Sequence, residues 1–153
     1  MNYKGVIITG VRCGGKTYFS KKICKNKDFE LVRAITTRTK REDDSEDQYE
    51  YVDDVKFKGK DLAISAEYGE YHYGIEYQQI DKIHQNDKIP VLVITPKSFA
   101  EFSRNLNNYL SIYFDAEDDV LDQRIMNRDE NGVKKDDIKQ RDLDRQFSNL
   151  CVY

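Results

Sequence analysis

Short runs of apolar, largely β-branched residues alternate with longer amphipathic segments along the chain. The clearest runs are Val6–Thr9, Ile89–Ile94 and Leu110–Phe114, and Phe29–Ile35, which Glu30 and Arg33 interrupt, also predicts a strand. Continuous apolar runs of this length are typical of strands buried in a parallel sheet. Two weaker runs, Tyr49–Val52 and Asp61–Ala66, predict further small strands. The pattern therefore predicts a sheet whose strands come from well-separated parts of the chain.

The intervening segments have the spacing of helices. We expect helices over Tyr18–Lys25, Ile75–Gln85, Ser98–Leu106, Glu117–Met126 and Asp136–Leu150. Ser98 is a candidate N-cap because Glu101 follows it three residues later. Strands that alternate with helices predict an α/β fold with a mainly parallel sheet flanked by helices.

Composition narrows the class of protein. A chain of 153 residues forms one ordinary domain, and 39% hydrophobic residues are too many for disorder. No run approaches the roughly 18 apolar residues that span a bilayer, so we expect no membrane segment. The net charge of −3 argues against a general nucleic-acid binder. Three cysteines without metal-ligand spacing predict a reduced, cytoplasmic protein.

Charge is distributed unevenly behind that small net value. Residues 1–41 carry 11 basic and 2 acidic side chains, whereas residues 42–54 carry 8 acidic and no basic ones. A basic first quarter attracts anions such as phosphate-bearing small molecules, although solvated charge segregation also explains such a pattern.

The strongest motif follows the first apolar run. Residues 10–17 read Gly-Val-Arg-Cys-Gly-Gly-Lys-Thr and match the phosphate-loop pattern between a strand and a helix. Gly10, Gly14 and Gly15 let the backbone curl so that successive N–H groups point at phosphate oxygens. Lys16 is expected at the β- and γ-phosphates, and the Thr17 hydroxyl at Mg²⁺. Arg12 and Cys13 fill the variable positions of the predicted ATP site.

A second cluster of basic and hydroxyl side chains follows the second apolar run. Arg38 and Arg41 lie three residues apart within Thr36–Arg41, and Tyr49 and Tyr73 follow downstream. Two guanidinium forks beside hydroxyl groups suit a second, fixed phosphate. An arginine pair alone is more often a solvated surface feature, but a preceding phosphate loop strengthens the phosphate interpretation.

The order of these motifs resembles the guanylate kinase family of P-loop nucleoside-monophosphate kinases. The matching elements are the phosphate loop at residues 10–17, T-T-R-x-x-R at 36–41, Tyr49-Glu50-Tyr51, Tyr73-Gly74, and the arginines Arg124, Arg128 and Arg141. The resemblance covers essentially the whole chain. It implies a core over about residues 1–35 and 88–153, an acceptor-binding β insertion over about 36–75, and a helical lid over about 124–141.

The resemblance also implies an activity and its residues. ATP and Mg²⁺ would bind at the phosphate loop with Arg124 and Arg128, and a monophosphate acceptor would be held by Arg38, Arg41, Tyr49 and Tyr73. Lys16, Arg38, Arg128 and Arg141 would stabilise the charge of in-line γ-phosphoryl transfer. We therefore expect a kinase that acts on a GMP-like nucleotide or a related phosphorylated small molecule.

The family's base-reading residues are not matched. Its guanine-reading Glu falls at Ile64, its second guanine-contacting Asp at Thr95, and its Ser before T-T-R at Ala34. A shifted strand register would make Glu67 a substitute for the first of these. A carboxylate that lies near the metal in the family falls at Val93, which leaves Asp115 as a candidate helper or a helix N-cap.

Three functions fit a sequence that matches the phosphate-binding residues of the family but not its base-reading residues. The protein is a kinase for a different phosphorylated acceptor, a kinase that reads guanine through other contacts, or a nucleotide-binding regulatory module with little catalysis. An acceptor-independent ATPase is a further option. The predicted elements end sooner than in typical family members, which would leave a sheet edge open, so we expect a possible homodimer.

Overall fold

The computed structural model describes residues 3–40, 42, 44, 47–128 and 134–150. Its described helices and strands occur in the order β1 (Gly5–Gly10), α1 (Lys16–Ile23), β2 (Phe29–Leu31), β3 (Ala34–Thr36), β4 (Tyr49–Tyr51), α2 (Asp54–Lys58), β5 (Leu62–Tyr68), β6 (Tyr71–Glu76), α3 (Tyr77–Gln85), β7 (Ile89–Val93), α4 (Pro96–Phe102), a 3₁₀ turn (Ser103–Asn105), β8 (Tyr109–Phe114), α5 (Asp118–Arg128) and α6 (Lys135–Leu150). None of the described helices is long and apolar enough to cross a membrane.

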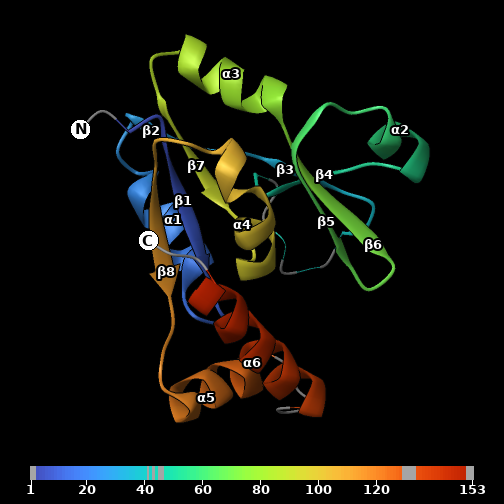
Figure 1. Cartoon of the computed structure of the whole chain (residues 1–153), viewed down its shortest axis with the longest axis vertical. Coiled ribbons are helices and arrows are strands. Elements are labelled where there is room, and N and C mark those ends of the chain that lie inside the picture. Colours follow the sequence, from blue (N-terminus) through green and yellow to red (C-terminus); the bar gives the residue numbers. More distant parts are fainter. Residues whose placement is uncertain (1–2, 41, 43, 45–46, 129–133, 151–153) are drawn as a thin grey trace.

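Strands β2, β7, β1 and β8 form a parallel sheet in that order, flanked by helices (Figure 1). The α/β fold class expected from the sequence is thereby confirmed. Strand β1 lies between β7 and β8. Every one of its residues is buried, as its unbroken apolar sequence predicts. All strands of this sheet point towards the end of the molecule where α5 and α6 lie (Figure 1).

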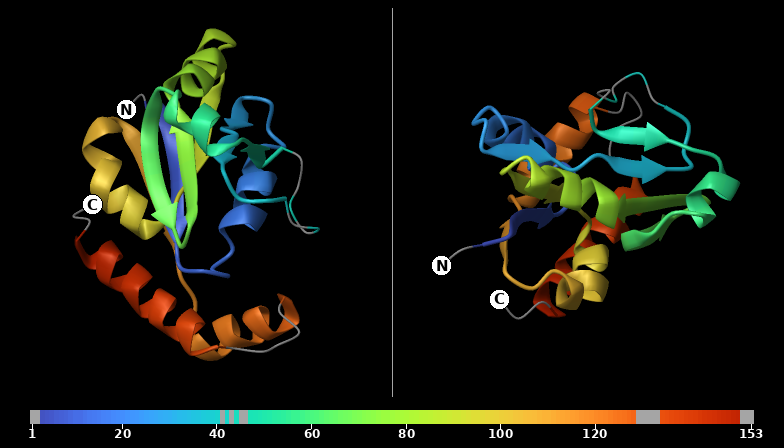
Figure 2. Two further views of the ribbon diagram at one scale, coloured as in Figure 1. Left: turned by 90° about the vertical axis from the view of Figure 1, so that its right-hand side faces the viewer. Right: turned by 90° about the horizontal axis from the view of Figure 1, so that it is seen from above.

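A second, smaller sheet lies beside the first, and its strand order is β4-β3-β6-β5 (Figure 1). Strands β3 and β4 are parallel, whereas β3–β6 and β5–β6 are antiparallel. This sheet occupies the part of the chain where we expected an acceptor-binding insertion. Figure 2 shows it to one side of the parallel sheet, with α2 at its outer end.

The expected strand Phe29–Ile35 is divided between the two sheets, which corrects the sequence prediction. Its first part, β2, pairs with β7, and its second part, β3, pairs with β4 and β6. Val32 and Arg33 form the break. An apolar run cannot reveal such a break, because Val32 and Ile35 are both buried, one on each side of it.

Three helix starts also differ from the sequence prediction by two residues, and the first is that of α1, which begins at Lys16 and not at Tyr18. Helix α4 begins at Pro96 with Thr95 as its N-cap, since the Thr95 hydroxyl accepts a hydrogen bond from the Ser98 N–H at 3.1 Å. Ser98 is therefore inside the helix. Helix α3 begins at Tyr77, because Ile75 belongs to β6 and pairs with Ile64 of β5.

One apolar cluster joins the two sheets. It contains Ile7 and Leu92 from the parallel sheet, Ile64 and Ile75 from the second sheet, and Phe99 from α4. A separate cluster on the opposite face packs Val6, Ile8 and Val91 beneath α1. The second sheet is thus fixed to the core by buried apolar area rather than by a linker.

Candidate active site

The phosphate loop connects β1 to α1 and has the backbone that its glycines permit. Gly10 has a φ of 137° and Gly15 a φ of 106°. A Cβ on Gly10 would lie 2.0 Å from the carbonyl oxygen of Phe114. The loop can therefore leave the sheet beside β8 only because residue 10 has no side chain. Cys13 also has a positive φ, at 60°.

Lys16 is folded back onto the loop. Its Nζ donates to the carbonyl oxygens of Gly10 and Val11, at 2.7 Å each. Burial lowers the pKa of Lys16, and attraction to Asp144 opposes that shift. The ammonium group is therefore held against two main-chain carbonyl oxygens of the loop.

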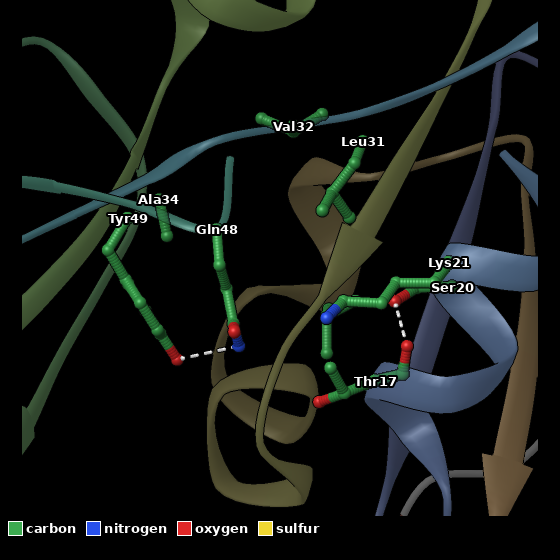
Figure 3. Close-up of a pocket in the computed structure, with 9 residues that line it drawn as sticks. Thr17, Ser20, Lys21, Leu31, Val32, Ala34, Gln48 and Tyr49 are labelled. Atoms are coloured by element: carbon green, nitrogen blue, oxygen red, sulfur yellow. Dashed lines mark hydrogen bonds between the residues drawn. The ribbon is translucent and has the colours of Figure 1, made fainter. Parts of the chain in front are cut away.

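The first turn of α1 is suited to an anion. Gly15 precedes it, it carries no acidic side chain, and Lys16 and Thr17 are its first two residues. The positive end of the helix dipole and the unpaired N–H groups of a first turn attract phosphate oxygens. Thr17 and Ser20 face towards the second sheet (Figure 3).

The residues present fit a magnesium ion that keeps most of its water. Thr17 supplies a hydroxyl beside the loop, whereas Val93 at the end of β7 supplies no ligand. Asp115 does not replace it, because both its carboxylate oxygens accept from Arg145, at 3.0 and 3.1 Å. Within the described residues no three or more His, Cys, Asp or Glu side chains form a metal-binding group. One hydroxyl plus phosphate oxygens is nevertheless a common set for Mg²⁺.

The expected lid arginines divide into two groups. Arg124 Nη1 donates to the carbonyl of Cys13 in the phosphate loop at 3.1 Å. Arg128 lies near enough to Lys16 for its charge to contribute to the lowered pKa of that lysine. Arg141 is instead buried between α5 and α6, where its Nη1 donates to Asp122 at 2.6 Å. Arg141 therefore ties the two helices together and does not contact the loop.

Arg12 is held by α6 as well. Its guanidinium forms an ion pair with Asp137, a carboxylate that is 4% exposed. Asp137 also accepts from the Lys134 N–H, at 3.0 Å. The Arg12 side chain, which occupies a variable position of the loop, is therefore directed towards α6.

A second cationic cluster lies on the small sheet. Arg38 is buried, and its carbon Cζ lies 5.1 Å from the centre of the Tyr49 ring and 5.8 Å from that of Tyr51. Tyr73 lies beside Tyr49, with ring centres 6.2 Å apart. Strand pairing places these groups together, because Thr36 pairs with both Tyr51 and Tyr73.

Asp44 occupies the fork of Arg38. The two Arg38 Nη atoms donate to its two oxygens at 2.7 and 3.0 Å, and the Tyr51 hydroxyl donates to it at 2.8 Å. The pKa of Arg38 is raised by this hydrogen bond to Asp44, and interaction with Tyr73 raises it further. Burial raises the pKa of Tyr49. The cluster can therefore bind a planar or tetrahedral oxyanion.

Arg41, the second arginine expected in this cluster, lies outside the described residues. Its place in the acceptor site therefore remains a sequence prediction.

The positions where the family reads guanine are used here for packing and capping. Ile64 is 3% exposed within the apolar cluster that joins the two sheets. The Thr95 side chain caps α4. Ala34 is partly buried against the same cluster. Ile64 and Ala34 thus have no side-chain hydrogen-bonding group for a ligand. Thr95 has a hydroxyl, but this hydroxyl is already hydrogen-bonded to Ser98.

Glu67 does not take over from Ile64. It pairs with His72 across the β5–β6 ladder, and its side chain is 76% exposed beside that histidine. Because neighbouring residues of a strand face opposite sides, Glu67 and Ala66 point away from each other, and Ala66 pairs with Tyr73 of the acceptor cluster. The register that would make Glu67 a substitute is therefore not the one observed.

One residue of each predicted phosphate site, Thr17 and Tyr49, lines a small cavity of about 20 Å³ (Figure 3). Thr17, Ser20 and Lys21 of α1 line one side, and Gln48 and Tyr49 of the small sheet line the other (Figure 3). Ala34 and Val93 also line it. Gln48 Nε2 donates to the Tyr49 hydroxyl at 3.3 Å across this wall (Figure 3).

Three carboxylates belong to the site that sequence patterns did not identify. Asp44 and Asp137 form ion pairs with Arg38 and Arg12, and the charge of Asp144 opposes the lowering of the Lys16 pKa. Asp44 lies in the acidic stretch that resembled a solvated loop. Asp137 and Asp144 lie seven residues apart on α6, which places them on one helix face. This spacing was the only feature of the sequence that could have suggested a shared role for them.

The comparisons with known proteins support the fold alone. No family model and no curated protein matches this sequence. Among solved structures, guanylate kinase from Anaplasma phagocytophilum is similar, with 18% identity and a TM-score of 0.54. The similarity covers 74% of this chain and 60% of that one. The chain therefore has a guanylate-kinase-like P-loop fold.

Proposed function

We propose that the protein is an ATP-dependent kinase that transfers the γ-phosphoryl group to a nucleoside monophosphate, GMP-like, or to a related phosphorylated small molecule. The observation that carries this proposal is the shared cavity. Thr17 of the phosphate loop and Tyr49 of the arginine–tyrosine cluster line the same space. A hydroxyl of the phosphate loop and a phenol of the acceptor cluster that border one space fit a phosphoryl donor facing a phosphorylated acceptor.

The donor side rests on the phosphate loop. Main-chain N–H groups of residues 10–17 bind the phosphates, Lys16 neutralises the charge that develops during transfer, and Arg124 and Arg128 approach from α5. Mg²⁺, held by Thr17 and phosphate oxygens, would supply further neutralisation of the transferring group. Arg141 contributes by holding α5 against α6 through Asp122.

The acceptor side rests on Arg38, Tyr49 and Tyr73, with Arg41 added from the resemblance. The guanidinium fork of Arg38 matches a phosphate bidentately, and the phenols donate to the remaining oxygens. A phosphate must replace Asp44 in this fork. A cavity of about 20 Å³ holds about one water molecule, so acceptor binding also requires the two sides to separate.

The part of the acceptor beyond its phosphate is read differently from guanine. Ile64 and Ala34 offer no hydrogen bonds, and a site that lacks carboxylates leaves the N–H groups of guanine without partners. Each such unpaired group costs about 1–3 kcal/mol of binding free energy. We therefore expect a GMP-like acceptor to be recognised mainly through its phosphate, and related phosphorylated molecules that lack this donor pattern to be acceptors as well.

A nucleotide-binding module with little catalysis is the second candidate. Val93 favours it, because the strand end beside the loop carries no carboxylate for the metal. The intact Lys16 and Thr17 favour the kinase instead.

An ADP-release assay over a panel of nucleoside monophosphates and sugar phosphates separates these functions. ADP formation that needs both an acceptor and Lys16 supports the kinase. ATP binding without acceptor-dependent turnover supports the module, and ADP release that is equal with and without acceptors supports an ATPase. Either of the last two results overturns the kinase proposal.

A further inference from the structure

Among the described residues that line the cavity between α1 and the small sheet, Lys21 alone carries a charge. The polar residues beside it are Thr17, Ser20, Gln48 and Tyr49, and the remaining lining residues are apolar, so none of them is a carboxylate. In Figure 3 the Lys21 side chain extends from α1 towards Gln48, into the space between the two walls. A cation therefore faces the space that Thr17 and Tyr49 also border.

The position of Lys21 on α1 explains why it faces this space. Lys21 follows Thr17 by four residues within α1, and residues with this spacing lie on the same face of a helix, one turn apart. Thr17 belongs to the first turn, where the phosphate loop ends. Lys21 thus extends the face that begins at the phosphate loop, and brings a positive charge to the side of α1 that faces the small sheet.

Lys21 also differs from the principal cations of the two predicted phosphate sites, because they are engaged by groups of the protein. Lys16 donates to two loop carbonyls, and Arg38 is held by Asp44. Lys21 makes no hydrogen bond or ion pair with any residue in the part of the chain that the structure describes. Val93, which borders the same cavity, offers it no carboxylate. A phosphate can therefore reach Lys21 without displacing a protein group, whereas it must displace Asp44 from Arg38.

Transfer between two phosphates requires a cation in such a place. An oxygen of the acceptor's phosphate forms a bond to the γ-phosphorus of ATP, the bond from that phosphorus to the β–γ bridging oxygen breaks, and the electron pair leaves with ADP. Both reactants are anions and repel each other as they approach. An ammonium group between them reduces this repulsion and stabilises the charge of the transition state, and it keeps its own protons throughout.

We propose that Lys21 is a further catalytic residue, which binds the γ-phosphoryl group and the acceptor's phosphate at the point where one is transferred to the other. The proposal deepens the proposed function and rests on it. Lys16 lies against the loop and serves the donor, whereas Lys21 lies one turn along α1 and serves the junction of donor and acceptor.

Calorimetric titration with ATP and with adenosine 5′-pentaphosphate, both with Mg²⁺, tests this role without an identified acceptor. The pentaphosphate carries two more phosphates than ATP, which would continue from the loop into the space beside Tyr49. Lys21→Met removes the charge and keeps an unbranched side chain. The control is Lys22→Met, because Lys22 is exposed on the same helix and does not line the cavity.

Lys21→Met should bind the pentaphosphate about tenfold more weakly than the wild type and should bind ATP within about threefold of it. Lys22→Met should stay within about twofold for both ligands. A pentaphosphate affinity of Lys21→Met equal to that of the wild type or of Lys22→Met overturns the proposal. An equal loss for ATP and the pentaphosphate also overturns it, because Lys21 would then act on the donor alone. A wild type that binds the pentaphosphate no more tightly than ATP overturns it as well.

Rates of ADP release with the acceptor panel separate this result from the proposed function. The kcat of Lys21→Met should fall at least about tenfold below that of Lys22→Met. Acceptor-dependent turnover that is equal in these two variants, together with unchanged pentaphosphate affinity, leaves the kinase standing and removes Lys21 from it. Weaker pentaphosphate binding by Lys21→Met in a protein whose wild type shows no acceptor-dependent turnover supports Lys21 as a phosphate ligand and overturns the kinase.

Discussion

Arg38 donates to both carboxylate oxygens of Asp44, at 2.7 and 3.0 Å, and both side chains are buried. The strongest cation of the acceptor cluster thus has a bidentate partner from its own chain. The geometry is that of a guanidinium bound to a phosphate. Removing one member of such a pair leaves a buried charge without a partner, so substitutions of Arg38 must keep the charge.

Arg38→Lys is expected to weaken the acceptor and spare the donor. A lysine keeps the positive charge opposite Asp44 but lacks the planar fork that binds two oxygens at once. The KM for the phosphorylated acceptor should rise at least about tenfold, equivalent to about 1.4 kcal/mol, and the KM for ATP should stay within twofold. Steady-state kinetics with Arg104→Lys gives the control, because Arg104 is an exposed arginine of the 3₁₀ turn Ser103–Asn105. An equal loss for both substrates would remove Arg38 from the acceptor site.

Lys16→Ala is expected to lower kcat by about 10²–10⁴, because the lysine neutralises charge that develops in transfer. The substitution also removes the two hydrogen bonds to the Gly10 and Val11 carbonyls. Lys22→Ala is the matched control, since Lys22 lies exposed on the same helix. Rates of ADP release under saturating ATP measure the effect. A kcat for Lys16→Ala near that of the control contradicts the proposed role.

Gly10→Ala is expected to disrupt the loop. Its Cβ would meet the Phe114 carbonyl oxygen at 2.0 Å, and a φ of 137° is strained for any side chain. We expect the midpoint of urea unfolding to fall and ATP binding to be lost. Gly59→Ala, whose Cβ would have no neighbour closer than 3.6 Å, should leave both unchanged. A Gly10→Ala protein with normal ATP affinity would show that the contact between residue 10 and the Phe114 carbonyl does not determine the loop conformation.

Ile64→Glu is expected not to restore guanine recognition. Ile64 is buried among apolar side chains, so an ionised carboxylate there would be uncompensated and would lower the free energy of unfolding by about 3 kcal/mol or more. Ser65→Glu, at the exposed neighbouring position, should change it by less than about 0.5 kcal/mol. Urea unfolding and a GMP turnover assay are the measurements. A stable Ile64→Glu protein that gains GMP turnover would place residue 64 in the acceptor site.

Asp115→Asn is expected to lower stability at neutral pH but not in strong acid. Burial tends to raise the pKa of Asp115, but the hydrogen bonds from Arg145 and from the Ala116 N–H outweigh it and lower the pKa. A carboxyl whose folded pKa is lowered stabilises the fold above its unfolded pKa near 3.8, and this contribution disappears as the pH falls through the folded value.

The difference in unfolding free energy between wild type and Asp115→Asn should therefore shrink as the pH falls below about 4. The pair is partly solvated, so the difference at pH 7 should be about 1 kcal/mol or less. Urea unfolding at a series of pH values measures it. A difference that grows in acid would contradict the lowered pKa.

Local pattern was sufficient for the parallel sheet and for the phosphate loop. The buried run at Val6–Thr9 and the glycines after it encode a strand, a turn and a helix start within a few neighbouring residues. The fold class followed from the alternation of such elements. Helix starts were less accurate, because Thr95 and Ser98 are both capping residues and only the position of Pro96 separates them.

The carboxylates around the two anion sites were not predictable in the same way. Asp44 reaches Arg38 through a loop, and Asp137 reaches Arg12 across more than a hundred residues. In sequence, both resemble ordinary solvated acids. Their burial depends on tertiary packing, which neither periodicity nor motif spacing encodes. The division of Phe29–Ile35 between two sheets had only a weak signal, because Arg33 interrupts the apolar pattern at the break just as Glu30 interrupts it within β2.

The chain passes between its two sheets twice, at Val32–Arg33 and where Glu76 leads into α3. If the small sheet turned relative to the parallel sheet, it would turn about these two passages. Ile64 and Ile75, however, share one buried cluster with Ile7 and Leu92. A rotation that admits an acceptor must therefore keep these side chains in contact and buried. Close packing of this cluster restricts such a rotation to a small amplitude.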